Sequence, residues 1–323
     1  MGNISIKEKV LNSIKPIIAN SKLVSVDFGK ISALAKKLKN YPLPGWDNVS
    51  QFSGNPEETI QYYFFLDSIN FCFWNKKDKA RWEFKKGGQW IHGYYAYSYA
   101  IKKAFLKDKR LLDAFYLSNI SFPEFSKIFQ SRGELLLLKE RHKIIQENFK
   151  ILQNKYQGKA INLIRAAKND VNALVNLIIR DFPNFRDWTE LKKHRVYFLK
   201  RAQLFVSDIY YALRGKGFGY FKNMEDLTIF ADYKLPQLLE SEGVLIYDKK
   251  LRNKIKTQEL IKKSSLEEIE IRANTIYSCE MILKELNGMG KKLTSNNLDW
   301  MLWVLSKKTK SSLSYHKTIT ISY

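Results

Sequence analysis

The chain has 323 residues, of which 45% are hydrophobic and 27% charged, and its 55 Lys and Arg residues against 32 Asp and Glu give a net charge of +23. This composition excludes a disordered chain, and two cysteines are too few for a disulfide scaffold or a cysteine zinc site. No apolar run approaches the roughly 20 residues that cross a bilayer, so we expect a cytoplasmic protein without membrane contact.

Helical periodicity dominates the chain. The spacing of apolar residues predicts helices over residues 31–38, 57–65, 95–107, 134–153, 171–180, 191–213 and 266–286. A small hairpin is predicted between residues 81–84 and 89–92, which flank the turn sequence Lys85-Lys86-Gly87-Gly88. No repeat or low-complexity linker marks a boundary. We expect one mostly α-helical domain over residues 1–323, with a minor β-hairpin.

The sequence predicts neither a metal site nor a cofactor site. The four histidines lack the spacing of metal ligands. The glycine-rich run at residues 215–220 lacks the third glycine of a dinucleotide fingerprint at the required position, and it follows a predicted helix where that motif needs a strand. We interpret it as the turn that ends the helix.

Residues 64–74 place the polar residues Asp67 and Asn70 among large apolar side chains. Burying a carboxylate there costs several kcal/mol unless it is paired. We therefore expect Asp67 either to cap a helix or to receive a cationic group of a ligand. Three aromatic residues of this stretch offer a flat face for stacking on a heterocycle: Phe71, Phe73 and Trp74.

The stretch 194–204 is predicted to be helical and contains Lys200. One apolar face comprises Phe198, Leu199, Ala202, Val206, Ile209 and Leu213. Lys200 lies on the opposite face with Val196, Leu204, Ser207 and Tyr211. The helix is therefore expected to pack on both sides, and Lys200 either reaches water or is held near a counter-charge.

Residues 226–239 contain a carboxylate without an obvious structural role. Pro236 suits the first turn of a helix, which places the expected N-cap at Leu235. Asp232 then lies in a loop beside Phe230 and Ala231, too far away to cap that helix. We regard Asp232 as the best carboxylate in the chain for chemistry.

Several segments together resemble the queuosine salvage protein family, the queuosine 5′-phosphate N-glycosylases. In the order of that family they are residues 66–74, 93–94, 182–187, 198–203, 227–237, 268–273 and 298–303. The most specific is 227–237, with the sequence Leu-Thr-Ile-Phe-Ala-Asp-Tyr-Lys-Leu-Pro-Gln. The chain departs from the family pattern at Leu199, where Tyr is more frequent, and at Lys234, where Arg is usual; the second change weakens the case for a bidentate contact.

The resemblance implies a fold similar to the helix-hairpin-helix DNA glycosylases and hydrolysis of queuosine 5′-monophosphate to queuine and ribose 5-phosphate. The partner is then a small nucleotide, with no obligate nucleic acid and no cofactor. Lys200 and Asp232 match the lysine and aspartate that the related DNA glycosylases pair at the reacting sugar carbon. Asp232 is expected to stabilise the oxocarbenium character of the ribose, and Lys200 to keep Asp232 ionised or to assist the departing base.

The other expected contacts concern substrate binding. Asp67 is the candidate for the cationic amine of the queuine side chain, Asn70 for a ring edge, and Phe71 or Trp74 for stacking. Arg201 and Lys234 are the candidates for the 5′-phosphate, and Tyr233 lies between Asp232 and Lys234 in the same motif.

The charge of +23 keeps a second class of function open. Lys and Arg neutralise nucleic-acid phosphates, so a non-catalytic or DNA-glycosylase-like protein that binds nucleic acid through its basic surface is the alternative. Against it, 43 of the basic residues are lysines spread along the chain, whereas readout of bases usually depends on Arg. A small phosphorylated substrate would also be attracted by a positive field.

Overall fold

The described part of the chain contains fourteen α-helices and six short strands, so the predicted mostly helical class is confirmed. The computed structural model describes residues 4–46, 52, 54–77, 79–191 and 193–323. The helices are α1 (Ile6–Ala19), α2 (Phe28–Lys39), α3 (Pro56–Ser68), α4 (Gly93–Lys107), α5 (Ala114–Asn119), α6 (Phe122–Ile128), α7 (Leu138–Tyr156), α8 (Ile161–Ala166), α9 (Val171–Asp181), α10 (Lys200–Ala212), α11 (Lys234–Ser241), α12 (Lys249–Lys256), α13 (Leu266–Gly288) and α14 (Ser295–Lys308). Within these residues, no helix has both the length and the apolar character that a membrane span needs.

The strands form three separate antiparallel pairs rather than one sheet. They are β1 (Val24–Val26) with β6 (Leu245–Tyr247), β2 (Glu83–Lys86) with β3 (Gln89–His92), and β4 (Trp188–Leu191) with β5 (His194–Tyr197). The β2–β3 pair confirms the predicted hairpin, but its first strand lies two residues later than residues 81–84. Lys86 pairs with Gln89, so the turn consists of Gly87 and Gly88 alone, both of positive φ. The other two pairs were not predicted.

Helix starts that carry a sequence signal lie close to their predicted positions. The side chain of Asn55 accepts the N–H of Glu58, and Pro56 occupies the first turn of α3. Asp170 caps α9 in the same way, by accepting the N–H of Ala173 at 2.8 Å. Each cap satisfies an N–H that has no partner inside the helix.

The prediction of one helix over residues 191–213 was wrong. The β4–β5 hairpin occupies its first part, and α10 begins only at Lys200. Leu199 lies in the left-handed region with φ of 56°, which no α-helix continues through. The main-chain oxygen of Asp187 accepts the N–H groups of Phe198 and Leu199, so a contact from outside the segment fixes the bend.

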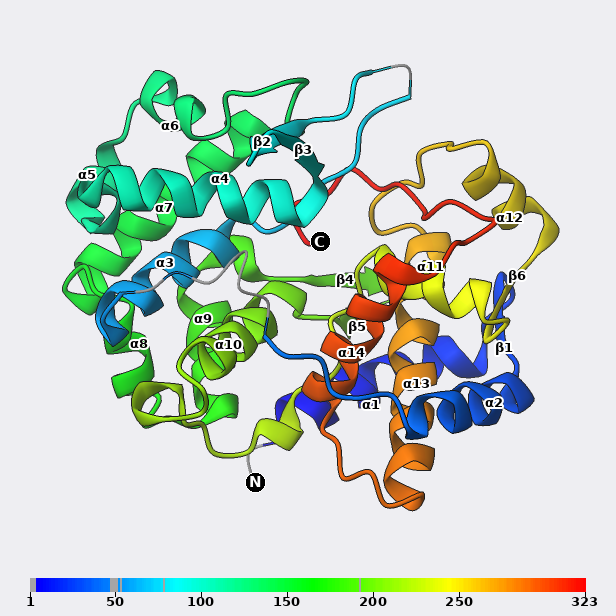
Figure 1. Ribbon diagram of the computed structural model, residues 1–323. Helices are drawn as coiled ribbons and strands as arrows, with labels where there is room; N and C mark the ends of the chain where they lie inside the picture. Colours follow the sequence, from blue (N-terminus) through cyan, green and yellow to red (C-terminus); the bar gives the residue numbers. More distant parts are fainter. Residues whose placement is uncertain (1–3, 47–51, 53, 78, 192) are drawn as a thin grey trace.

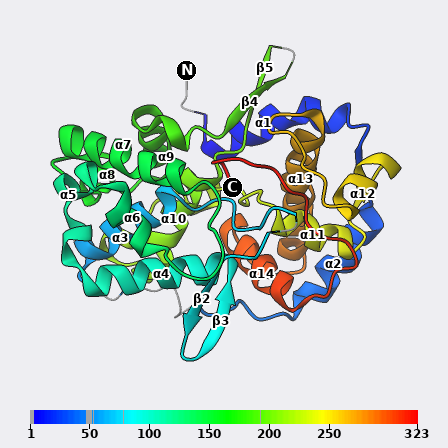
Figure 2. The same cartoon turned by 90° about the horizontal axis from the view of Figure 1, so that it is seen from above.

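The helices form two groups, which Figures 1 and 2 show from two directions. Helices α3 to α10 make up one group, and α1, α2 and α11 to α14 make up the other. In the second group α1 and α2 pack on α13, and the β1–β6 pair joins the N-terminal part of the chain to the segment after α11. Side-chain hydrogen bonds from Ser207 to Asn296 and from Asn297 to Tyr211 connect α10 with α14.

Candidate active site

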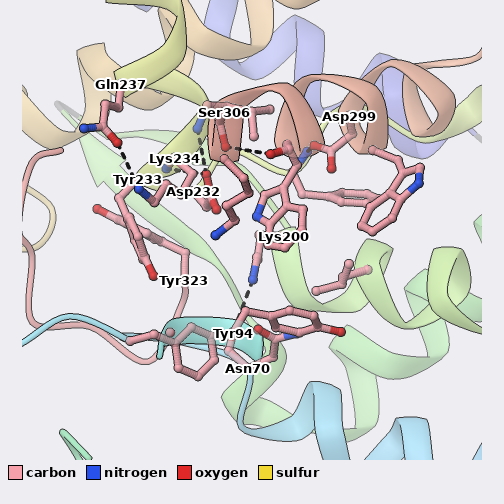
Figure 3. A pocket seen from close by; sticks show the side chains of 18 of the residues that line it. Asn70, Tyr94, Lys200, Asp232, Tyr233, Lys234, Gln237, Asp299, Ser306 and Tyr323 are labelled. Atoms are coloured by element: carbon pink, nitrogen blue, oxygen red, sulfur yellow. Dashed lines mark hydrogen bonds between the residues drawn. The ribbon is translucent and has the colours of Figure 1, made fainter. Parts of the chain in front are cut away.

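A cavity of about 340 Å³ lies where the two groups of helices meet. Its walls come from α10, α14, the start of α4, the segment leading into α11 and the C-terminal segment that ends at Tyr323. Figure 3 shows Lys200 and Asp232 extending into this space, with Asp299 of α14 to the upper right and Asn70 and Tyr94 below.

Lys200 is the first residue of α10, and hydrogen bonds fix both its main-chain N–H and its side-chain ammonium. Its N–H donates to Oδ2 of Asp187 at 3.0 Å, and its Nζ donates to the main-chain oxygen of Asn70 at 3.2 Å. The residue is only 7% exposed. Burial lowers the pKa of the Lys200 ammonium, while the negative charges of Asp232 and Asp67 oppose that shift.

Asp232 has a structural role that the sequence did not predict. Helix α11 begins at Lys234, before Pro236, and Oδ1 of Asp232 accepts the N–H of Lys234 at 2.7 Å and of Leu235 at 3.0 Å. The expectation that Asp232 caps nothing was therefore wrong. Within the described residues, its Oδ2 accepts no hydrogen bond, so one oxygen is fixed at the helix start and the other remains available in the cavity.

Lys200 and Asp232 share the cavity without touching. They form no ion pair within 4.0 Å in the described part of the chain, yet Asp232 exerts the largest stabilising electrostatic effect on the Lys200 ammonium. The two charged groups therefore line one space, which leaves room for a reacting atom near both.

Two further aspartates line the same cavity. Asp299 is 8% exposed and accepts the N–H of Phe230 at 2.8 Å. Burial, reinforced by the negative charge of Asp232, raises the pKa of Asp299 to about 8 despite that hydrogen bond. Burial and the adjacent carboxyl of Asp67 raise the pKa of Asp208 well above its usual value. Burial therefore favours the protonated form of both Asp299 and Asp208.

Aromatic rings form much of the remaining wall. Trp46 stacks on Tyr211 with ring centroids 4.7 Å apart, and Trp300 stacks on Trp303 at 5.4 Å. Tyr94 meets Trp303 edge to face at 5.7 Å. Rings of this kind offer flat, weakly hydrated surfaces to a heterocyclic ligand.

Three cations line the cavity on the side of Asp232. They are Arg81, Lys234 and Lys307, and none of them forms an ion pair within the described residues. Lys307 reaches the surface, but desolvation of its ammonium and the positive charge of Lys234 lower its pKa to about 8. Unpaired neighbouring cations of this kind suit an anionic group of a ligand.

The structure brings together six of the candidate residues singled out in the sequence. The cavity is lined by Asn70, Lys200, Asp232, Tyr233 and Lys234, as well as by the stacking candidate Phe73. Asp67, Phe71, Trp74 and Arg201 do not line it. In the described part of the chain, no group of three or more His, Cys, Asp or Glu residues is placed to hold a metal ion.

Asp67 lies in the last turn of α3 and is fully buried. Its Oδ1 accepts the amide of Asn70 at 3.1 Å, so neither sequence-based alternative, helix cap or direct ligand contact, describes it. Burial raises the pKa of Asp67 to about 7, against the lowering effects of Asn70 and Lys200.

Arg201 and Phe71 stabilise the chain behind the cavity. The Arg201 guanidinium donates to the main-chain oxygens of Ser68 and Asn184 and lies 5.3 Å from the ring of Phe71. Arg141 lies 4.2 Å from the same ring. Neither the expected phosphate contact of Arg201 nor the expected stacking of Phe71 fits this arrangement, because those groups are already engaged in the core.

Trp74 is also engaged outside the cavity. It is 4% exposed, and the ammonium of Lys317 lies 5.5 Å from its ring. Because its ring lies outside the cavity wall, Trp74 is not placed to make the expected stacking contact with a ligand.

The sequence contained a signal for the residues that were missed. Leu204, Ser207 and Tyr211, which helical spacing placed on the face of Lys200, all line the cavity together with Asp208. The lining residues of α14 likewise follow helical spacing: Asn296, Asp299, Trp300, Trp303, Ser306 and Lys307. What the sequence lacked was any indication that these two stripes face each other.

Comparison with known proteins supports one family. Residues 50–323 match the family model described as queuosine salvage protein. A protein of Sphaerobacter thermophilus named queuosine 5′-phosphate N-glycosylase/hydrolase is 34% identical over 317 residues, which cover 97% of each chain. Proteins of the same name are 30% identical in Bos taurus, with 96% of this chain and 97% of that one covered, and 34% identical in Nematostella vectensis, with 82% of each covered.

Proposed function

Because this chain belongs to the queuosine salvage protein family, we propose that it is an N-glycoside hydrolase that releases queuine from queuosine 5′-monophosphate, with ribose 5-phosphate as the second product. The observation that carries the proposal is the presence of Lys200 and Asp232 in one cavity. This reaction needs a mononucleotide and no nucleic-acid partner. Two free, buried cysteines fit a reducing compartment such as the cytoplasm.

We assign Asp232 the role of stabilising the positive charge at the sugar carbon. Breaking the N-glycosidic bond places positive charge on the ribose, and a carboxylate held beside it stabilises that charge. Its Oδ1 is fixed by two N–H groups of α11, which leaves Oδ2 to face the ribose. Water then bonds to the carbon and gives a proton to Asp232, while the base leaves with the electron pair of the broken bond.

Lys200 is assigned two roles. Its positive charge lies across the cavity from the carboxylate of Asp232, and it supplies the proton that the departing base takes up. A lysine whose pKa is lowered by burial gives up a proton more readily than an exposed one. The hydrogen bond to the oxygen of Asn70 holds the ammonium in place.

The three unpaired cations are assigned to the 5′-phosphate. Lys234 follows Asp232 by two residues, and the charges of both residues influence the pKa of Lys307. A phosphate bound there would place its ribose next to Asp232. Lys307 and Arg81 thus replace Arg201 as candidates beside Lys234.

The test is a comparison of four substrates for release of free base, detected by chromatography and mass spectrometry. Purified protein is incubated with queuosine 5′-monophosphate, queuosine, queuosine-bearing tRNA and a damaged DNA duplex. Release from the monophosphate, at a rate well above that from the nucleic acids, is expected. Salt-sensitive binding of tRNA or duplex without release from the monophosphate would instead favour a nucleic-acid-binding protein.

A further inference from the structure

Three buried cations lie at or behind the wall of the cavity and form no ion pair within the described residues. They are Arg141 of α7 and the neighbours Lys200 and Arg201 of α10. Their side chains donate to main-chain oxygens instead. Because a guanidinium keeps its proton when it is buried, its N–H groups need acceptors inside the protein, and here carbonyl groups provide them.

Most of these oxygens belong to residues 67–72, the segment in which α3 ends. Every one of its six main-chain oxygens accepts a hydrogen bond from one of the three cations: Asp67 and Ser68 from Arg201, Asn70 from Lys200, and Ile69, Phe71 and Cys72 from Arg141. We call residues 67–72 the clamped segment. Carbonyl dipoles that converge on one point repel each other, so an arrangement of this kind is stable only around positive charge.

Arg141 holds the second half of the clamped segment. Its Nη1 donates to the oxygen of Ile69, and its Nη2 donates to the oxygens of Phe71 and Cys72, the latter at 3.3 Å. Its Nε donates to the oxygen of Leu136 at 3.0 Å, which anchors the guanidinium beside the start of its own helix. Cys72 lies in the left-handed region with φ of 53°, which is unfavourable for a residue other than glycine. This turn therefore depends on contacts from outside the segment, of which Arg141 provides one.

The orientation of one peptide unit links Arg141 to the cavity. The N–H of Phe71 donates to the oxygen of Ile69 at 3.1 Å, the same oxygen that Arg141 holds. In a trans peptide unit the N–H and the C=O point in opposite directions, so the oxygen of Asn70 points away from that of Ile69. Nζ of Lys200 donates to the oxygen of Asn70 at 3.2 Å, a bond that Figure 3 shows between the two labelled residues. Arg141 on one side of the segment thereby sets where Lys200 finds its acceptor on the other.

Resting on the proposed function, we propose that Arg141 is a positioning residue for Lys200. By fixing the oxygen of Ile69, it presents the oxygen of Asn70 to the ammonium and keeps the ammonium where the departing base takes up its proton. Arg141 does not line the cavity and acts only through the clamped segment.

The surroundings of Arg141 make this role testable. Its guanidinium lies 4.2, 5.3 and 5.6 Å from the rings of Phe71, Phe73 and Tyr97, which keep it in place. Because Arg141 belongs to α7, its replacement does not alter α10, whereas Arg201 is part of α10 itself. Methionine fills most of the volume of the arginine stem without its N–H groups.

The experiment compares kcat for two substrates that share ribose 5-phosphate and differ in the leaving group. The base of queuosine 5′-monophosphate takes up a proton as it leaves, whereas the nitrophenolate of 4-nitrophenyl β-D-ribofuranoside 5-phosphate leaves without one. Arg141→Met is expected to lower kcat about 100-fold for the nucleotide and less than about 5-fold for the aryl glycoside. Arg141→Lys keeps the charge, but one ammonium cannot replace the fork, so it should show the same selective loss, about 10-fold for the nucleotide. Equal losses for the two substrates would assign Arg141 a purely structural role and overturn the proposal.

A double variant tests whether Arg141 acts through Lys200. Lys200→Met should show the same selective loss, and adding Arg141→Met to it should lower kcat for the nucleotide less than about twofold further. Losses that multiply would overturn the proposal. The matched control is Arg165→Met, because Arg165 donates to Oδ1 of Asn162 at 2.8 Å and does not line the cavity. Its kcat values should equal those of the wild type for both substrates.

Crystal structures of the wild type and of Arg141→Met separate this inference from the proposed function, because they need no turnover. The distance from Nζ of Lys200 to the oxygen of Asn70 is expected to lengthen from 3.2 Å to beyond about 3.5 Å, the limit of a hydrogen bond. An unchanged distance overturns the positioning role, whatever the activity. A wild type that hydrolyses neither substrate refutes the hydrolase proposal alone, and the distance still decides this one. Arg141→Lys takes the place of Arg141→Met in these measurements if Arg141→Met does not fold.

Discussion

Arg272 and Asp187 form a buried bidentate ion pair that joins the two chain segments carrying the proposed catalytic residues. The guanidinium Nη1 and Nη2 of Arg272 donate to the two carboxylate oxygens of Asp187 at 2.9 and 2.7 Å. The same carboxylate accepts the N–H of Lys200, and Nε of Arg272 donates to the oxygen of Ala231, next to Asp232. One guanidinium of α13 thus fixes the backbone on both sides of the cavity.

Arg272→Met is expected to lower both stability and activity. Burial alone would raise the pKa of Asp187, but Arg272 holds it below its usual value, so the variant leaves a buried carboxylate without its partner. Such a loss typically costs about 3–5 kcal/mol, to be measured by urea unfolding. The control is Arg195→Met, which breaks the exposed pair with Glu190 and should cost about 1 kcal/mol or less. Equal effects of the two variants would contradict the role assigned to Arg272.

Asp232→Asn is expected to abolish turnover while substrate binding and folding stay near normal. The amide oxygen still accepts the N–H groups of Lys234 and Leu235, so α11 keeps its start, but the negative charge facing the ribose is lost. The loss in kcat is expected to exceed about 100-fold, measured by base release. Asp248→Asn is the matched control, because Asp248 caps α12 through the N–H of Leu251 and does not line the cavity. More than about a hundredth of the wild-type rate in Asp232→Asn would remove Asp232 from catalysis.

The raised pKa of Asp299 predicts how the free energy of unfolding depends on pH. Its pKa is raised to about 8 in the folded protein from an ordinary value of 3.8, so the folded state holds a proton that the unfolded state has released. The unfolding free energy should therefore fall as pH rises from about 4 through 8. Asp67, with a pKa of about 7, acts in the same direction. In Asp299→Asn the decline should be shallower, by up to about 1.4 kcal/mol per pH unit.

Urea unfolding at pH 5, 6, 7 and 8 checks this prediction. Asp181→Asn is the control, because Arg180 keeps the pKa of Asp181 below its usual value and its stabilising effect is lost only in acid. That variant should run parallel to the wild type over this range. A parallel curve for Asp299→Asn would show that Asp299 does not carry a proton at neutral pH.

The sequence predicted helices where local signals suffice. Helix α9 was predicted within one residue of its end and α13 within two, because a side-chain cap starts each and an apolar pattern continues it. The β4–β5 hairpin was missed because the bend at Leu199 depends on Asp187, whose own position depends on Arg272. A conformation fixed by partners distant in the chain leaves no local pattern.

The candidate site likewise divides into features that local sequence predicts and features that depend on contacts distant in the chain. Lys200 and Asp232 could be chosen from their sequence surroundings, but their meeting in one cavity required α10 of one group of helices and the start of α11 of the other group to face the same space. Asp67 and Asp208 show most clearly what the sequence does not predict. The carboxyl group of Asp67 lies behind the cavity wall, whereas that of Asp208 lies on it. A sequence indicates that a carboxylate is unusual among apolar residues; it does not indicate on which side of the wall the side chain ends.

Lys307→Met is expected to weaken recognition of the 5′-phosphate. Lys307 and Lys234 face the same part of the cavity without a carboxylate partner, and a phosphate would neutralise both. The ratio of kcat/KM for queuosine 5′-monophosphate to that for queuosine should fall about 10-fold. Because the pKa of Lys307 is lowered to about 8, the wild-type ammonium loses its proton above that pH, and KM for the monophosphate should rise there. In Lys307→Met this rise should be smaller, because the group that titrates is gone.

The matched control is Lys308→Met, since Lys308 is the next residue of α14, lies near the ring of Tyr41 and does not line the cavity. If Lys307→Met keeps the wild-type ratio as Lys308→Met does, Lys307 does not bind the phosphate.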